Sequence, residues 1–430
     1  MSKHKQDPVV GPSKQRLLSV LGPGLITGAS DDDPSGIATY SQTGAQFGFA
    51  LTWTMLFSYP LMSVVQEISA RIGRTTGRGI AGNMRKYYPN WLLQAVVFLL
   101  LIANIINIGA DLGAMADALK LIVGGPSLVY VVAFGAVSVV LQIFLKYSRY
   151  VSILKWLTLS LFAYFGTILF VPVAWGEVAW GLFIPKFTSE ASFWTSVVAI
   201  LGTTISPYLF FWQASQEVED EKAKPERQPL KQAPKQAENA IGRIRLDTYV
   251  GMAFSNIVAL AIIVTAGATL HANGVTNIES TSQAAEALKP VAGAFAFAIF
   301  ALGVIGTGLL AIPVLAGSAG YALGEARKWP TGLDRKPLEA KAFYATIAAA
   351  TLLGVCLNFT PVNPIKALYW SAVVNGVVAV PVMAVMMLMT ARRDIMGETT
   401  VPLTMRAIGW IATAVMAAAA VVMIVQLFWA

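Results

Sequence analysis

Charged residues, cysteine and histidine are scarce in this sequence, and each scarcity excludes a class of protein. Aspartate, glutamate, lysine and arginine make up 13% of the 430 residues, whereas hydrophobic residues make up 56%. A soluble globule of this length would need more polar side chains to cover its surface. The mean hydropathy of +0.63 agrees with a chain surrounded by lipid. We therefore expect an integral membrane protein.

The lone cysteine and the two histidines exclude several kinds of site. Cys356 stands alone, so the chain forms neither an internal disulfide nor a cluster of thiolate metal ligands. It falls within an apolar run, where we expect it to pack as a small hydrophobic residue. His4 and His271 both fall outside the apolar runs. A proton relay of imidazoles through the membrane interior is therefore not expected.

Apolar runs long enough to cross about 30 Å of hydrocarbon recur along nearly the whole chain. Their pattern predicts an all-α membrane protein with eleven spans. The predicted spans cover residues 17–46, 49–70, 91–118, 127–145, 150–172, 192–216, 248–270, 290–322, 340–357, 365–390 and 404–429.

Two polar segments lie outside these spans. Residues 1–16 are predicted to form a cytoplasmic tail, and they lack the short apolar core of a cleaved signal peptide. Residues 219–245 are rich in Pro, Lys, Gln and Glu and cannot bury a core of their own. We expect this second segment to be a mobile cytoplasmic linker.

Lysine and arginine gather in alternate loops, which predicts the orientation of the chain. This positive-inside pattern places the N-terminus in the cytoplasm and, for an odd number of spans, the C-terminus outside the plasma (inner) membrane. The net charge of +8 then follows from topology, so no nucleic-acid partner is expected, and no obligate protein partner or cofactor is indicated. The basic groups lie before residue 17 and within residues 71–86, 146–149, 222–245, 327–336 and 392–393.

Three consecutive aspartates interrupt the first predicted span. The stretch GASDDDPSGIATYS, residues 28–41, places Asp31, Asp32 and Asp33 where an unpaired charge is unfavourable. Pro34 lacks an N–H and disfavours helix at the preceding residue, so we expect the helix to break here. A break inside the membrane frees backbone oxygens for an ion site, and one of the three carboxylates would reach it. The alternative is a solvated helix end that the triplet caps.

A second break is predicted in the sixth span. In LGTTISPYLFFWQASQ, residues 201–216, Pro207 follows Thr203, Thr204 and Ser206, whose hydroxyls are oxygen donors for a cation. Taken alone, this pattern also fits a proline kink with hydroxyls bonded to the preceding turn. Two broken helices five spans apart are the sequence sign of an inverted repeat with a substrate site at the midplane. The pair favours a transporter.

These stretches resemble the Nramp family of divalent-metal transporters. The resemblance is carried by GPGLITGASDDDPSGIATYSQTGAQFG, QEISARIGRTTGRGIA, NIGADLGAMADAL, TTISPYLFFWQ, DTYVGMAFSNIVALAI and VIGTGLLAIPVLAGSAG. It implies a LeuT-type fold with a metal site between broken helices 1 and 6. Two inverted five-helix repeats would occupy residues 17–172 and 192–390, with an eleventh span at 404–430.

Two departures from the family motifs bear on the metal. The family reads Asp-Pro-Gly-Asn where this chain has Asp-Pro-Ser-Gly at residues 33–36, and Met-Pro-His where it has Ser-Pro-Tyr at residues 206–208. A thioether selects softer transition metals, whereas Mg²⁺ takes oxygen ligands and keeps several waters. The pattern is most similar to the divergent Nramp-related magnesium transporters.

The predicted metal site has one charged ligand and several neutral ones. Asp33 would supply the charge, Ser206 and Thr203 hydroxyl oxygens, and Gly36 room for a partly hydrated ion. Thr203 and Thr204 equally fit hydroxyls bonded to the preceding turn, and for Asn375 an interhelical hydrogen bond is favoured over a place in the cavity. Further side chains assigned to the cavity or its surroundings are Asp31, Asp32, Asp111, Asn375, Tyr208 and Gln213.

The resemblance also predicts the mode of transport. Proton-coupled members carry histidines where this chain has Tyr208 and Gln213, and an acidic pair of which it keeps only Asp111, with Ala114 replacing the glutamate. We expect import of Mg²⁺, with Mn²⁺ as a second substrate, by alternating access without protons. One alternative is a proton-coupled Mn²⁺/Fe²⁺ importer that uses Asp33 and Asp111. A remote one is an intramembrane aspartyl enzyme, but the stretch ending at Asp111 lacks the Gly-x-Gly-Asp signature.

Overall fold

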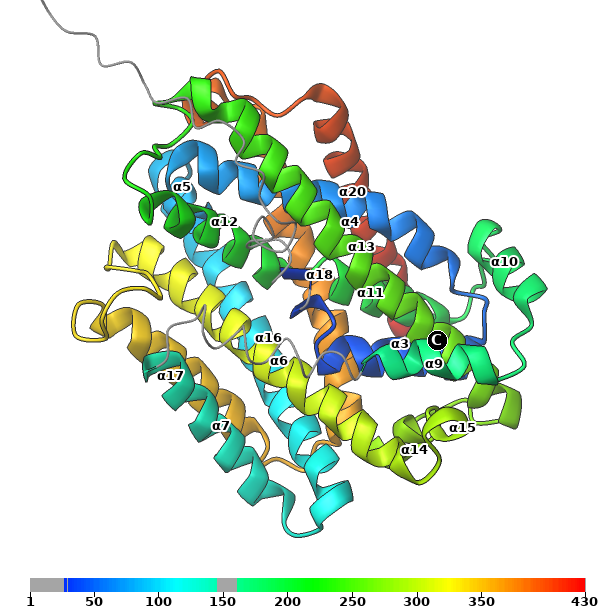
Figure 1. Cartoon of the computed structure of the whole chain (residues 1–430). Helices are drawn as coiled ribbons and strands as arrows, with labels where there is room; N and C mark the ends of the chain where they lie inside the picture. Colours follow the sequence, from blue (N-terminus) through cyan, green and yellow to red (C-terminus); the bar gives the residue numbers. More distant parts are fainter. Residues whose placement is uncertain (1–26, 29, 145–160, 430) are drawn as a thin grey trace, which may run out of the picture.

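The chain folds as a bundle of helices (Figure 1). The computed structural model describes residues 27–28, 30–144 and 161–429. The helices are α3 (Pro34–Phe47), α4 (Trp53–Thr76), α5 (Ile80–Tyr87), α6 (Asn90–Val123), α7 (Ser127–Phe144), α9 (Phe162–Phe170), α10 (Trp175–Phe183), α11 (Ala191–Thr204), α12 (Pro207–Lys222), α13 (Ala237–Thr269), α14 (Thr281–Glu286), α15 (Lys289–Ala292), α16 (Ala296–Arg327), α17 (Lys341–Leu357), α18 (Pro364–Thr390), α19 (Arg393–Met396) and α20 (Leu403–Trp429).

Every predicted span that falls within the described ranges contains a helix. Seven stretches there are long and apolar enough to cross a membrane by length and composition. The predicted tail, residues 1–16, lies outside the described residues, as do residues 17–26 of the first span and 150–160 of the fifth. The seven stretches are Asn90–Val123, Ser127–Phe144, Ala191–Lys222, Pro234–Asn273, Gly293–Arg327, Pro364–Thr390 and Leu403–Phe428.

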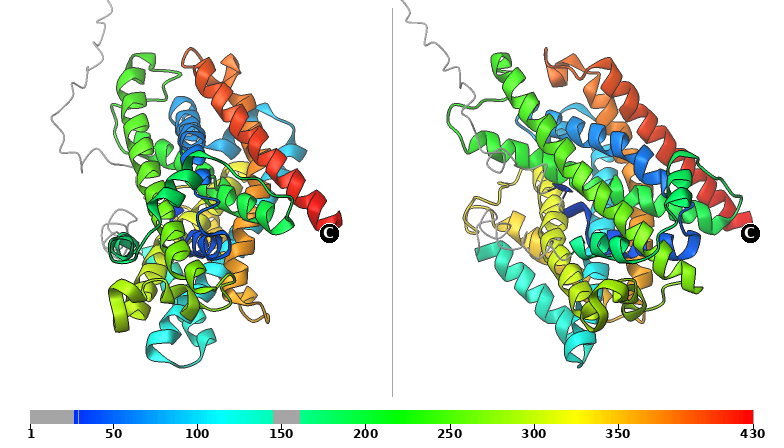
Figure 2. Two further views of the ribbon diagram at one scale, coloured as in Figure 1. Left: turned by 90° about the vertical axis from the view of Figure 1, so that its right-hand side faces the viewer. Right: turned by 45° about the vertical axis from the view of Figure 1, so that its right-hand side comes forward.

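The outer helices present apolar side chains outward, as lipid requires. α7 and α17 pack against each other on one side of the molecule (Figure 1), and α20 runs along another edge (Figure 2). Large exposed residues such as Phe144 and Leu353 cover these helices. Cys356, expected to pack as a small hydrophobic residue, is exposed on α17, on the outward side of an apolar helix. An apolar span has a lipid-facing side, and sequence alone did not assign Cys356 to it.

Glycines allow the central helices to approach closely. A Cβ at Gly202 of α11 would stand 2.0 Å from the Ala372 carbonyl oxygen and 2.4 Å from the Gly376 nitrogen on α18. A Cβ at Gly73 of α4 would likewise stand 2.1 Å from the Ala214 carbonyl oxygen on α12. Such backbone-to-backbone packing is typical of membrane helices. These close contacts hold α11 against α18 and α12 against α4, so each half of the sixth span packs on a neighbouring helix.

The segment predicted as a linker is shorter than residues 219–245 and is packed. Its ends belong to α12 and α13, which leaves residues 223–236 between them. The Leu230 and Lys231 N–H groups donate to the Arg74 and Thr75 carbonyls at 3.2 and 3.0 Å, and Leu230 is buried. Arg74 also pairs with Glu221 at 3.2 Å. The polar composition concealed these contacts because they are made with the end of α4 rather than within the segment.

Candidate metal site

The first span breaks at the aspartate triplet, in the interior of the protein. Residues 30 and 31 are helical, Asp32 lies in a bend, and α3 begins at Pro34. Asp33 is the N-cap of α3, where its Oδ1 accepts from the Gly36 N–H and the Ser35 hydroxyl, both at 2.7 Å. Pro34 fits the first helical position because its missing N–H needs no partner there. Asp33 therefore caps a helix, but it is 1% exposed, which contradicts the alternative of a solvated helix end.

The sixth span breaks in the same way. α11 ends at Thr204, Ser206 adopts an extended conformation, and Pro207 is the first residue of α12. The Ser206 hydroxyl donates to the Gly202 and Thr203 carbonyls, each at 2.8 Å, and the Thr204 hydroxyl donates to Ile200 at 2.9 Å. The hydroxyls thus bond to the preceding turn, and the helix is nevertheless interrupted rather than only kinked.

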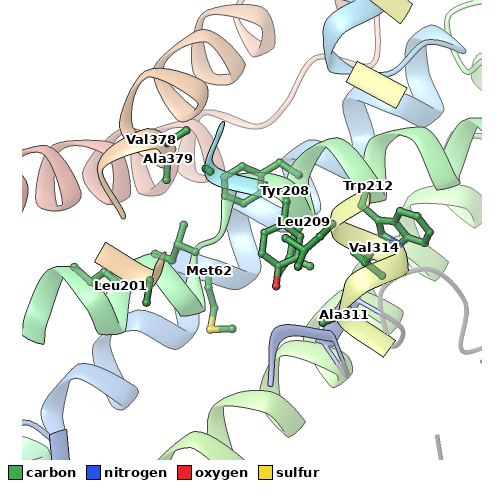
Figure 3. Packing of buried hydrophobic residues seen from close by; sticks show 14 of the residues in the cluster. Met62, Leu201, Tyr208, Leu209, Trp212, Ala311, Val314, Val378 and Ala379 are labelled. Atoms are coloured by element: carbon green, nitrogen blue, oxygen red, sulfur yellow. The ribbon is translucent and has the colours of Figure 1, made fainter. Parts of the chain in front are cut away.

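The second oxygen of Asp33 faces two other helices. Asn107 of α6 donates its Nδ2 to Asp33 Oδ2 at 3.1 Å, and the Tyr208 hydroxyl of α12 donates to it at 3.3 Å. Tyr208 is also 3.2 Å from the Ser30 carbonyl oxygen, and it projects from α12 among buried apolar residues (Figure 3). Among the described residues no Lys, Arg or His hydrogen-bonds to Asp33. A buried carboxylate held only by neutral donors suits a bound cation.

Gly36 marks the contact between the two breaks. A Cβ there would lie 3.1 Å from the Thr203 hydroxyl oxygen and 3.2 Å from the Asp31 carbonyl oxygen. α3 therefore meets α11 just after Asp33, with two oxygen atoms beside a residue that has no side chain. The structure brings Asp33, Gly36, Thr203 and Tyr208 together from three helices.

Asp31 and Asp32 turn toward a different helix. The Ser255 hydroxyl of α13 lies 2.6 Å from Asp31 Oδ2 and 3.2 Å from Asp32 Oδ1. The other carboxylate oxygens, Asp31 Oδ1 and Asp32 Oδ2, are buried without a hydrogen bond in the described part of the chain. The side chains of the triplet therefore diverge, with Asp33 bonded to α6 and α12 and its two neighbours bonded to α13.

The other three residues predicted for the cavity, Asp111, Asn375 and Gln213, are all buried but have different surroundings. Asp111 of α6 is fully buried, and it interacts with the backbone N–H of Ser35 and electrostatically with Asp33. Asn375 of α18 is buried with both amide atoms unpaired among the described residues, so its expected interhelical bond is not seen. Gln213 instead connects helices, because it accepts from Gln66 at 2.7 Å and donates to Thr248 at 3.0 Å.

Sequence reasoning missed Asn107 and Ser255. Asn107 lies four residues before Asp111, so both fall on one face of α6. That spacing of two polar residues in an apolar span was the signal that could have identified Asn107. Within the described residues no three His, Cys, Asp or Glu side chains gather to hold a metal. A cation at Asp33 would therefore be held by at most two such side chains, together with neutral oxygens.

Sequence comparison places the chain in a known family. Residues 24–426 match the Nramp family, described as natural resistance-associated macrophage protein-like. The chain belongs to the Nramp family. It is 27% identical over 412 residues to the divalent metal cation transporter MntH of Klebsiella pneumoniae, which covers 93% of this chain and 92% of that one. It is 28% identical over 304 residues to MntH of Yersinia enterocolitica, covering 69% and 70%.

Solved structures show the same fold. The Eremococcus coleocola manganese transporter, in complex with an aromatic bis-isothiourea substituted compound, matches with a TM-score of 0.75 at 16% identity, covering 98% of this chain and 89% of that one. Mhp1, a nucleobase-cation-symport-1 family transporter, matches with a TM-score of 0.52 at 15% identity, covering 95% and 92%. The LeuT-type fold is thereby confirmed, and this Nramp protein is an integral membrane protein. Its relatives are named as transporters, which agrees with the prediction that it is not an enzyme.

Proposed function

We propose that this Nramp protein imports divalent metal cations by alternating access, with Mg²⁺ as the main substrate and Mn²⁺ as a second. The observation that carries the proposal is Asp33, a buried carboxylate at the break of one helix and beside the break of another. Within the described ranges, all of its hydrogen-bond partners are neutral. Broken helices of this kind form the ion sites of many transporters. The MntH relatives, named as divalent metal cation transporters, support the same substrate class.

The chemistry of the break favours a hard cation. Where ordinary members of the family have a methionine, this chain has Ser206, and a hydroxyl oxygen gives no preference for soft metals. The Ser206 proton points at carbonyl oxygens, so the lone pairs of its Oγ stay available to a cation or its water. Asp33 Oδ2, Ser206, Thr203 and the Asp31 carbonyl oxygen would be the ligands. Mg²⁺ would keep several of its waters.

The proposed import needs neither a second ion nor a cofactor. We place the N-terminus in the cytoplasm and the C-terminus outside the plasma membrane, following the distribution of lysine and arginine. A potential of about 100 mV, negative inside, contributes roughly 4.6 kcal/mol to the entry of a divalent cation. That term alone can drive uptake, and no obligate protein partner is needed.

A second candidate function is a proton-coupled Mn²⁺/Fe²⁺ importer. The observation that favours it is Asp111, a fully buried carboxylate that interacts electrostatically with Asp33. Such a group is able to exchange a proton as a cation arrives and leaves. Under this alternative, Asp111→Asn would abolish the dependence of Mn²⁺ uptake on external pH.

The test is uptake into proteoliposomes that enclose a Mg²⁺-sensitive dye. The native protein should give Mg²⁺ entry that excess Mn²⁺ inhibits and Cd²⁺ inhibits weakly, whereas Asp33→Asn should give none. Asp117→Asn is the matched control, because Asp117 lies on α6 and accepts only from Ser127 among the described residues, at 2.7 Å. Full Mg²⁺ uptake by Asp33→Asn, or stronger inhibition by Cd²⁺ than by Mn²⁺, would overturn the proposal.

A further inference from the structure

Asn107 of α6 hydrogen-bonds to Asp33 through the nitrogen of its side-chain amide, and the amide oxygen has no hydrogen-bond partner among the described residues. The residue is fully buried. Its Nδ2 donates to Asp33 Oδ2 at 3.1 Å, while its Oδ1 is buried without a hydrogen bond in the described residues. An ionised carboxylate only accepts hydrogen bonds, so the NH₂ group must face Asp33. The amide oxygen, bonded to the same carbon, is then a buried acceptor next to the site.

The two oxygens of Asp33 are held differently. Oδ1 accepts two bonds of 2.7 Å from within the N-cap of α3, and these bonds form the start of that helix. Oδ2 accepts longer bonds of 3.1 and 3.3 Å, from Asn107 and Tyr208 on other helices. A cation therefore reaches Asp33 at Oδ2 with the smaller loss of hydrogen bonding. The groups that must give way are Asn107 and Tyr208.

We infer that Asn107 is a metal-recognition residue whose amide turns to offer Oδ1 when a divalent cation binds at Asp33 Oδ2. This inference rests on the proposed function. The NH₂ group carries positive partial charge, so a cation at Oδ2 repels it. The terminal torsion of asparagine is broad and roughly two-fold, so the amide can exchange its nitrogen for its oxygen within the same volume. The oxygen then meets the ion or one of its waters.

The amide oxygen of Asn107 would contact Mg²⁺ and Ca²⁺ in different ways. A buried acceptor without a partner is unfavourable, and a bound cation or its water removes that penalty. Mg²⁺ dehydrates reluctantly and brings waters that donate to the amide oxygen, whereas Ca²⁺ takes more direct oxygen ligands. Loss of Oδ1 should therefore weaken the binding of Mg²⁺ by removing an acceptor for its waters, and the binding of Ca²⁺ by removing a direct ligand.

Three variants of the full-length protein test the inference. Asn107→Leu removes both amide atoms and keeps the same branching and number of side-chain heavy atoms, and Asn107→Asp keeps an oxygen. Asn104→Leu is the matched control, because Asn104 is fully buried one turn earlier on α6 and donates to the Leu315 carbonyl and Ser318 hydroxyl at 2.9 and 2.7 Å. The measurements are the KM for Mg²⁺ uptake and the shift of Tm with added Mg²⁺ or Ca²⁺ in detergent, which reports binding without transport.

Asn107→Leu should raise the KM and the apparent Kd for Mg²⁺ by about 10- to 100-fold, and it should also raise the apparent Kd for Ca²⁺. Asn107→Asp should bind Mg²⁺ at least as tightly as the native protein, and Asn104→Leu should keep the native KM. If Asn107→Leu does not fold, Asn107→Ala replaces it. The inference is overturned if Asn107→Leu leaves the Kd for Mg²⁺ unchanged, or if Asn107→Asp loses as much Mg²⁺ affinity as Asn107→Leu. In either case Asp33→Asn would still be inactive, so the proposed function would stand. Normal uptake by Asp33→Asn would instead overturn the proposed function.

Discussion

Asp33 combines two roles at the level of a single residue. Its Oδ1 caps α3, and its Oδ2 faces Asn107 and Tyr208. A helix cap is a structural role that asparagine also fills, whereas a cation needs the negative charge. The two roles can therefore be separated by substitution.

The first prediction separates the cap from the charge. Asp33→Ala should lose both transport and about 1 kcal/mol of stability, because an alanine N-cap leaves α3 without its side-chain acceptor. Asp33→Asn should lose transport but keep most of that stability. Thermal unfolding in detergent, measured beside Mg²⁺ uptake, distinguishes the two variants. Equal Tm values for Asp33→Ala and Asp33→Asn would contradict the capping role.

The second prediction concerns the space at Gly36. In Gly36→Ala the new Cβ would press on the Thr203 hydroxyl and the Asp31 carbonyl oxygen, at 3.1 and 3.2 Å. Displacement of these oxygens should raise the KM for Mg²⁺ by about tenfold or more. Gly242→Ala is the control, since no described atom outside its own helix lies within 4 Å of a Cβ there. Equal KM values for the two variants would show that these oxygens do not take part in metal binding.

At the scale of the helices, each break pairs an extended residue with a proline at the first helical position. Asp33 precedes Pro34 in α3, and Ser206 precedes Pro207 in α12. Proline stops the earlier half because it lacks an N–H and clashes with the preceding turn. It starts the later half because its φ is already helical. Both breaks were therefore predictable from the chain.

The third prediction tests how α11 is held in place. Gly202→Ala would push a Cβ into the backbone of α18, 2.0 Å from the Ala372 carbonyl oxygen. Since neither helix backbone yields easily, the free energy of unfolding should fall by about 1–3 kcal/mol or more. Thermal unfolding followed by size-exclusion chromatography measures the loss. Gly176→Ala of α10 serves as the control because a Cβ there meets open space, and an equally stable Gly202→Ala would refute the close packing.

At the scale of the whole molecule, the sequence predicted the helices and both breaks but not all of the contacts between them. Apolar runs and prolines are local signals, so they revealed the spans and the ends of α3 and α12. The bond from Asn107 to Asp33 joins residues 74 positions apart, and it depends on how α6 packs against α3. Gln213 was assigned to the cavity by resemblance, yet it bonds Gln66 and Thr248. Which face of an apolar span meets the site becomes visible only in the fold.

The central claim is that a cation at Asp33 crosses the membrane driven by its own gradient and the potential. The most direct test is Mg²⁺ uptake into liposomes holding a potassium diffusion potential, with internal pH recorded at the same time. We predict that uptake grows as the interior becomes more negative, that internal pH stays constant, and that Asp33→Asn abolishes the signal. Acidification in step with Mg²⁺ entry, lost in Asp111→Asn, would contradict uncoupled transport and favour the proton-coupled importer.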